Sequence, residues 1–360
     1  MKLQPSLANL YAQVAELLET GQKVCLGTIL QAKGSTPQVP GASAIFTADG
    51  LQAGTLGGGI LEGDAEKQAL DSLKTQASKL YSFELEADIA SPEGAICGGT
   101  VLVLLDVLPE KNRSTFVELQ QSLQRRQAGL ISTHIKKSLD HIEIKRQWTE
   151  GGLEALEQGK SPDSSLQITA ADIMGREPQL IVSHLEKQDD ESCRECLFLE
   201  PIFPLPQLVI TGAGHIGQAL THLGHRLDFE VTVVDDRPEY ANPESLPDAD
   251  NIVVGNIGEA LQKFPISADT YLVIVTRGHQ HDGDALRACV KTDAAYIGMI
   301  GSRTKIALMR EQFLEKGWAT AEEWARVHAP IGLDIQSKTV EEIAVSIAAQ
   351  LVQVRSRFNT

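Results

Sequence analysis

Basic charge is scarce in this sequence. It has 32 lysine and arginine residues against 48 aspartate and glutamate residues, which gives a formal net charge of −16. Nucleic acids and anionic membranes bind basic surfaces, so this balance argues against both as partners. Long apolar runs are absent as well, since no segment approaches the roughly 18 apolar residues of a membrane span. The opening stretch "MKLQPSLANLYAQVAELLETG" lacks the continuous apolar core of a secretion signal, so we expect a cytoplasmic protein.

Cysteine is also scarce, with five residues spread over 360 positions. Such spacing does not form a disulfide framework and is typical of a reducing compartment. Cys193 and Cys196 form one C-x-x-C pair, but no second pair stands at the spacing of a zinc finger. We therefore expect that pair to be incidental, and we expect Cys25 and Cys289 to be core residues of a strand and a helix.

The length of the chain exceeds what one hydrophobic core usually serves, which favours two domains. The proline-marked stretch "PIFPLPQ" divides it into residues 1–200 and 205–360. In the first part, apolar segments and an Asp49-Gly50 turn predict an α/β domain with a mixed sheet and a hairpin. The weaker pattern over about 128–200 predicts a strand-rich extension of this domain.

After the boundary, apolar strands alternate with helices. The strands "LVITG", "EVTVVDD", "TYLVIVT" and "AYIGMIG" are rich in β-branched residues and apolar throughout. Strands of this kind are buried on both faces, as in a parallel sheet covered by helices. The sequence therefore predicts a C-terminal Rossmann-like domain with a doubly wound parallel sheet.

The segment "LVITGAGHIGQAL" places Gly212, Gly214 and Gly217 in the G-x-G-x-x-G register between a strand and a helix. The first glycine permits a tight turn, the second lets a pyrophosphate approach the backbone, and the third lets helix meet strand. Asp235 ends the next strand, 18 residues beyond Gly217, close to the spacing of an acid that binds a ribose hydroxyl. NAD(P) is one candidate ligand, with His215 as a further contact. The alternative is a scaffold whose glycines serve only the turn and its packing.

Two further segments of this domain follow strands, and ligands bind at strand ends in open α/β sheets. "IGSRTKIALMR" places Arg303 at a helix start beside a serine and a lysine, which predicts an anion site. "TRGHQHDGDAL" gathers side chains that could bind a divalent metal, contact a ligand or cap a helix: His279, His281, Asp282 and Asp284. No Ser-Tyr-x-x-x-Lys pattern or similar hydride-transfer set follows the fingerprint, which argues against a simple dehydrogenase.

The N-terminal segment "AGTLGGGILEGDAEKQAL" sets Gly57, Gly58 and Gly59 directly before a helix, with Glu62 in the first turn. Consecutive backbone N–H groups at a helix N-terminus bind anions. A carboxylate does not attract phosphate, so Glu62 suits hydrogen-bond donors of a ligand or stabilisation of the helix start. The alternative is a tight strand-to-helix turn without a ligand.

Eight segments match, in order, the motifs of the xanthine dehydrogenase accessory factor family, XdhC/CoxI, which this chain resembles. They are "GSTPQVPGA", "GTLGGGILEGDA", "ICGGTVLVLL", "LVITGAGHIGQAL", "VTVVDDRPEYAN", "VTRGHQHDGDAL", "YIGMIGSRTK" and "VHAPIGLDIQSKTVEEIAVSI". The resemblance implies a chaperone that binds the molybdenum cofactor, a molybdopterin that can be nucleotide-extended, and inserts it into a xanthine dehydrogenase-type molybdoenzyme. It also implies that a cysteine desulfurase docks onto some members. Gln38 stands where a basic residue is expected in relatives, which would weaken an anion contact there.

The resemblance also gives a role to "AICGGT", which contains Cys97, Gly98 and Gly99. A thiolate left accessible by glycines suits a metal ligand, or a contact to a metal that is held by sulfur. The alternative is that Cys97 is a small buried hydrophobe.

The main hypothesis is a chaperone, expected to be a homodimer, that binds the molybdenum cofactor in a cleft between the two domains. It has no catalytic residues, and the predicted contacts are Gly57, Gly58, Gly59, Glu62, Cys97, Gly98, Gly99, Gly212, Gly214, His215, Gly217, Asp235 and Arg303. One rival is an NAD(P)-dependent oxidoreductase, in which Asp236-Arg237 leaves the choice of nicotinamide cofactor open. Another is a scaffold that bridges a sulfur donor and the apo-molybdoenzyme without holding cofactor.

Overall fold

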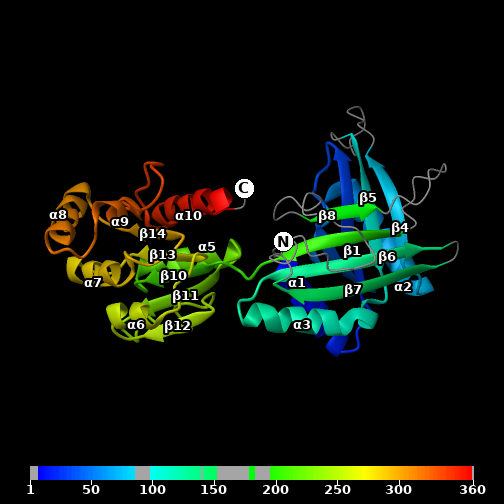
Figure 1. Cartoon of the computed structure of the whole chain (residues 1–360), viewed down its shortest axis with the longest axis horizontal. Helices are drawn as coiled ribbons and strands as arrows, with labels where there is room; N and C mark the ends of the chain where they lie inside the picture. Colours follow the sequence, from blue (N-terminus) through cyan, green and yellow to red (C-terminus); the bar gives the residue numbers. More distant parts are fainter. Residues whose placement is uncertain (1–6, 86–97, 139–140, 152–177, 183–194, 359–360) are drawn as a thin grey trace. The chain divides into compact units, whose positions relative to one another are not determined.

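The computed structural model describes residues 7–85, 98–138, 141–151, 178–182 and 195–358 (Figure 1). The chain divides into two compact units, residues 1–204 and 205–360. None of the helices in the described ranges is both long and apolar enough to cross a membrane.

The first unit contains a five-stranded antiparallel sheet in the order β3-β2-β1-β5-β4. Its strands are β1 (Cys25–Gly34), β2 (Ser43–Thr47), β3 (Gly50–Gly54), β4 (Lys79–Leu85) and β5 (Gly99–Asp106). The predicted hairpin is confirmed, because β2 and β3 pair across the turn and Gly50 has the positive φ of 92° that favours glycine. Helix α2 (Gly59–Thr75) covers one face of this sheet, where Leu61 and Ala65 join the apolar core with Phe46 and Val103.

A second antiparallel sheet in the order β7-β6-β9-β8 packs against strands of the first. Its strands are β6 (Gly129–Lys137), β7 (Ile142–Glu150), β8 (Gln179–Val182) and β9 (Glu195–Ile202). Leu30 and Leu104 of the first sheet meet Ile135 and Phe198 of the second. Helices α1 (Leu7–Glu19) and α3 (Arg113–Gln124) complete the core.

The predicted α/β fold class is confirmed, with one difference in the first unit. All described strand pairs there are antiparallel, whereas the sequence predicts a mixed sheet. The reason is connectivity, since β1, β2 and β3 follow one another through short links that only antiparallel neighbours allow. Helix α2 does connect two strands by a crossover, but these are β3 and β4, which lie at opposite edges and do not pair.

Four polar side chains form a buried charge cluster inside the first unit: Tyr11 of α1, Asp106 of β5, Arg146 of β7 and Glu200 of β9. Tyr11 donates a hydrogen bond to Glu200 Oε1 at 2.8 Å, and Arg146 Nη1 donates to Asp106 Oδ2. The side chains of Arg146 and Asp106 are each 2% exposed. Removing either partner of such a pair leaves an uncompensated charge in the core.

The cluster makes the stability of the first unit depend on pH through Glu200. Burial raises the pKa of Glu200 to about 7, although the Tyr11 hydrogen bond and the Arg146 charge act in the opposite direction. The folded unit therefore keeps a proton that the unfolded chain, with its ordinary carboxyl pKa, releases at lower pH. The resulting stabilisation is complete below about pH 4.5 and is lost as the pH rises through about 7.

We expect Glu200→Gln to remove this dependence. Relative to the variant, the unfolding free energy of the wild-type unit should fall by on the order of 2 to 3 kcal/mol as the pH rises through this window. Calorimetric unfolding of both proteins at several pH values measures the difference. Parallel pH profiles for wild type and variant would show that Glu200 does not titrate in this range.

The second unit is built on a six-stranded parallel sheet in the order β12-β11-β10-β13-β14-β15. Its strands are β10 (Gln207–Thr211), β11 (Glu230–Asp235), β12 (Asn251–Val254), β13 (Thr270–Ile274), β14 (Tyr296–Met299) and β15 (Val327–His328). The chain first winds outward from β10 to β12 and then restarts at β13 on the other side of β10. Ligands of open α/β sheets bind at this switch point, beyond the carboxyl ends of the strands. The predicted Rossmann-like parallel sheet is confirmed.

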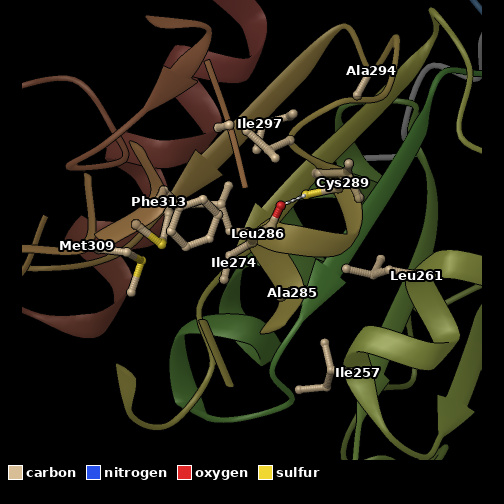
Figure 2. Close-up of a cluster of buried hydrophobic side chains, with 14 of the residues drawn as sticks. Ile257, Leu261, Ile274, Ala285, Leu286, Cys289, Ala294, Ile297, Met309 and Phe313 are labelled. Atoms are coloured by element: carbon tan, nitrogen blue, oxygen red, sulfur yellow. Dashed lines mark hydrogen bonds between the residues drawn. The ribbon is translucent and has the colours of Figure 1, made fainter. Parts of the chain in front are cut away.

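Helices cover both faces of this sheet (Figure 1). One face carries α5 (His215–Arg226) and α10 (Val340–Phe358), and the other carries α6 (Ile257–Lys263), α7 (His279–Cys289), α8 (Arg303–Glu315) and α9 (Ala321–Ala325). Figure 2 shows the core of the second face, where Leu286 of α7 and Phe313 of α8 pack with Ile274 of β13. Cys289 is buried in this core and Cys25 in the first unit, so both are core residues as predicted.

Candidate functional site

The glycine loop between β3 and α2 contains three consecutive residues with positive φ. The angle is 116° at Gly57, 71° at Gly58 and 58° at Gly59, a region that residues with a side chain rarely adopt. A Cβ on Gly57 would lie 2.8 Å from Pro37 Cγ, so packing also requires glycine there. A Cβ on Gly58 or Gly59 would meet no heavy atom within 4 Å. The space beside these two glycines is therefore open.

Glu62 holds this loop in place. Its Oε2 accepts hydrogen bonds from Leu56 N at 3.0 Å and from Thr55 Oγ1, which itself accepts from Gly57 N at 3.0 Å. No side chain in the described ranges caps the N-terminus of α2, which leaves N–H groups of its first turn for another acceptor. Stabilisation of the helix start is the role that the contacts of Glu62 display, and ligand binding by Glu62 stays a prediction.

Three segments distant in sequence form what we name the three-loop site: residues 34–40, 55–59 and 98–99. The first segment contacts the second through Pro37 and Gln38, whose Cγ atoms would lie 2.8 and 3.2 Å from a Cβ on Gly57. Gln38, the position that departs from the pattern of relatives, therefore packs directly against the glycine loop.

The first segment also approaches the third closely. Ser35 N donates to Gly98 O at 3.2 Å, and a Cβ on Gly34 would lie 2.9 Å from the same oxygen. A Cβ on Gly99 would lie 2.6 Å from Lys33 O. The predicted glycines of two separate motifs thus contact one shared segment. Cys97 lies outside the described residues, and its role as a metal ligand stays a prediction.

The glycines of the Rossmann fingerprint have different surroundings. A Cβ on Gly212 would lie 2.5 Å from Val275 O beyond β13, and a Cβ on Gly217 would overlap Gly212 O, so both are required by packing. Gly214 has an ordinary extended backbone, with φ −71° and ψ −174°. A Cβ there would meet no heavy atom within 4 Å. No contact in the described residues requires glycine at position 214, which fits the close approach of a ligand.

Asp235 ends β11 as predicted, but the protein itself engages its carboxylate. Oδ2 accepts from Ala213 N at 2.7 Å and from Arg237 Nη2 at 2.9 Å, and Oδ1 accepts from Arg237 N at 3.0 Å and Nε at 2.9 Å. Burial acts to raise the pKa of Asp235, but the hydrogen bonds from Arg237 and Ala213 outweigh it and hold the pKa below its usual value. Asp235 thus fixes the glycine turn, and ligand binding by it stays a prediction.

Other predicted contacts of the second unit are exposed near the carboxyl ends of the strands. His215 is the first residue of α5 and Arg303 the first of α8, and both are exposed. Ser302 caps α8 by accepting a hydrogen bond from Lys305 N, so the predicted anion site at Arg303 has a helix start already capped from within. Both side chains are accessible to a ligand.

The aspartates of α7 are engaged in contacts within the unit. Asp282 is fully buried, with Oδ1 accepting from Thr276 Oγ1 at 2.6 Å and Oδ2 accepting from Lys305 Nζ. Asp284 pairs with Arg287 at 2.9 Å. Across the part of the chain that the structure describes, no group of three or more potential ligands is placed to hold a metal ion. Of the roles open to these aspartates, contacts that hold helices together are the ones they display.

Two residues that shape these sites are not evident from the sequence. Arg237 clamps Asp235, although its motif suggests only a choice between nicotinamide cofactors. An arginine two positions after an aspartate can reach back to it across a turn, and this spacing is the signal that was there to find. Thr55 links Glu62 to Gly57, and its sequence context carries no such signal because the link depends on how the loop folds.

The two units define a class of protein in which an antiparallel α/β unit with a glycine-loop site precedes a Rossmann-like unit with a glycine turn at its switch point. The chain belongs to the XdhC/CoxI family. The family profile described as "XdhC and CoxI family" matches residues 17–84, and the "XdhC Rossmann domain" profile matches residues 208–351. The predicted resemblance is therefore confirmed.

Relatives extend the match over nearly the whole chain. A Bacillus subtilis protein whose name describes it as one of the probable subunits of xanthine dehydrogenase is 28% identical over 355 residues, which cover 98% of this chain and 99% of that protein. The molybdenum cofactor insertion chaperone PaoD of Escherichia coli is 20% identical over 345 residues, covering 94% of this chain and 86% of PaoD. A crystal structure from Bacillus halodurans, described as a xanthine dehydrogenase, has a TM-score of 0.73 and 26% identity, with 96% of both chains covered.

Proposed function

We propose that this chain binds the molybdenum cofactor, protects it and delivers it to a xanthine dehydrogenase-type molybdoenzyme. Membership of the XdhC/CoxI family and the similarity to a chaperone named for cofactor insertion support the proposal. The observation that carries it is the three-loop site, where Gly58 and Gly59 leave open space at an uncapped helix N-terminus.

The chemistry of the three-loop site suits the anionic end of this cofactor. N–H groups of the first turn of α2 and the helix dipole favour a phosphate, or the diphosphate of a nucleotide-extended form. Glu62 Oε2 is turned toward the loop, and its Oε1 would accept hydrogen bonds from the pterin ring. Cys97, which precedes Gly98 in the chain, would direct a thiolate toward the molybdenum.

The Rossmann-like unit would add further contacts. Gly214 and His215 offer an open backbone and an exposed ring at the start of α5, and Arg303 offers an exposed cation. Gly212, Gly217 and Asp235 would act indirectly, because they shape the turn that carries Gly214.

The action proposed is binding and handover, with no catalytic residue. The receiving molybdoenzyme is the main partner, and a cysteine desulfurase that supplies the terminal sulfur is a second. A homodimer is part of the proposal, since most soluble oligomers are symmetric homo-oligomers and the two-fold dimer is the commonest.

The test compares two glycines with the same backbone strain. Gly58 and Gly21 have φ of 71° and 72°, and a Cβ on either would meet no atom within 4 Å. Alanine at either position should therefore cost about 1 to 2 kcal/mol of stability through the backbone alone. Only Gly58→Ala should weaken binding of isolated molybdenum cofactor, by roughly tenfold or more, because its methyl group fills the proposed phosphate position. Equal affinities for the two variants would contradict the proposal.

A transfer assay separates this function from its rivals. Cofactor-loaded protein should activate an apo-xanthine dehydrogenase, and Cys97→Ser should reduce the loading. A scaffold would activate the apo-enzyme in the presence of free cofactor without retaining any itself. An oxidoreductase would oxidise NAD(P)H with a carbonyl substrate in the absence of the molybdoenzyme.

A further inference from the structure

The carboxylate of Asp235 occupies the position from which Rossmann folds bind the ribose of a dinucleotide, at the end of the second strand. In dinucleotide-binding proteins this acid accepts hydrogen bonds from ribose hydroxyls. Here its two oxygens accept four hydrogen bonds from within the unit, three of them from Arg237. The side chain of Asp235 is 3% exposed, so almost none of the carboxylate surface is left for a ligand.

Arg237 is itself held tightly in this arrangement. Its Nε and Nη2 form a two-pronged contact with the carboxylate, the geometry in which an arginine–carboxylate pair is strongest. The guanidinium also stacks over the ring of Tyr240, with Cζ 4.1 Å from the ring centre. Its side chain is only 18% exposed. A ribose could reach Asp235 only by displacing an arginine that is bound on its edge and on its face.

The neighbouring acid does not replace Asp235 in this role. Asp236 is more exposed, at 34% of its side chain, but two arginines face it. Arg277 Nη2 lies 3.6 Å from its Oδ2, and Arg237 Nε lies 4.0 Å from its Oδ1. Both acids of this turn are therefore neutralised by cations of the same unit.

We propose that Arg237 is a specificity-determining residue that closes the ribose-binding position of the Rossmann-like unit, so that the unit rejects NAD(H) and NADP(H). The phosphate of a ligand still finds open backbone at Gly214, but a ribose diol finds no acceptor at the end of β11. The ligand class that remains is a phosphate or diphosphate ester held without contact between a ribose diol and Asp235. The 2′-phosphate of NADP(H) gains little from Arg237, because Asp235 takes two of its donor nitrogens and Tyr240 takes its face.

NADH and NADPH are suitable probes because their fluorescence changes on binding. Wild-type protein should show no saturable binding up to about 1 mM of either probe. Arg237→Leu removes the clamp and should create saturable NADH binding, with affinity roughly tenfold or more above wild type. Adding Asp235→Asn to that variant should abolish the gain, since the freed carboxylate is what binds the ribose. Arg277→Leu is the matched control, because it removes an arginine from the same turn and leaves the clamp intact.

Arg237→Lys covers the case in which the leucine variant does not fold. Lysine keeps a positive charge but cannot form the two-pronged contact, so a smaller gain in NADH affinity is expected. Saturable binding of either probe by the wild type overturns the proposal, and so does the absence of any gain in both Arg237 variants that fold. The molybdenum cofactor takes no part in this experiment, so its outcome is independent of the proposed function.

Discussion

Gly217→Ala is expected to unfold the Rossmann-like unit. A Cβ on Gly217 would overlap the carbonyl oxygen of Gly212, and neither atom can move without breaking the turn that joins β10 to α5. Overlap between two backbone segments has no flexible side chain to relieve it, so we expect a loss of more than about 4 kcal/mol. Calorimetry should show that the unfolding transition of residues 205–360 is absent or strongly lowered.

Gly214→Ala provides the contrast within the same motif. The backbone at Gly214 suits any residue, and the added methyl group would meet no atom of the protein. Its effect on stability should therefore stay within about 0.5 kcal/mol, while binding of a phosphate-containing ligand should weaken. A stability loss as large as that of Gly217→Ala would show that position 214 is required for packing, which would remove the argument for a ligand there.

Arg146→Met should have the second-largest effect, on the first unit. The substitution leaves Asp106 buried without its ion partner and removes the positive charge that faces Glu200. Breaking a buried pair by removing one partner costs about 3 to 5 kcal/mol, measured here as the shift in chemical or thermal unfolding of residues 1–204.

The double variant Arg146→Met with Asp106→Asn tests the cause. Asparagine keeps the shape of Asp106 but carries no charge, so the pair of substitutions should recover a large part of the lost stability. If the double variant is as unstable as the sum of the single ones, loss of packing rather than an unpaired charge explains the effect.

Elements with a clear local pattern could be predicted from the sequence. The segment "KLYSFEL" coincides with β4, and the Asp49-Gly50 turn joins β2 to β3 as expected. These features depend on neighbouring residues alone. The partners of each strand could not be predicted, because β1 pairs with β5 across more than 60 intervening residues and through α2 and β4. The buried charge cluster is hidden for the same reason, since its members come from four elements.

The candidate sites divide along the same line. The roles of Gly212 and Gly217 follow from a motif whose geometry is local, and the structure bears out the packing requirement of both. The engagement of Asp235 could not be predicted from its spacing, because the expected acid is present but another residue of the same turn occupies it. The meeting of segments 34–40, 55–59 and 98–99 depends on close backbone approach between separate strands and loops, which no single motif encodes.

The most direct test of the central claim is retention of the molybdenum cofactor by this chain. Purified protein is incubated with isolated cofactor, passed through gel filtration, and assayed for molybdenum and pterin in the protein fraction. We predict that both elute with the protein in equal amounts, and that Gly58→Ala reduces them while Gly21→Ala does not. Elution of the wild-type protein without molybdenum or pterin, under conditions in which it still activates an apo-molybdoenzyme, would contradict the account.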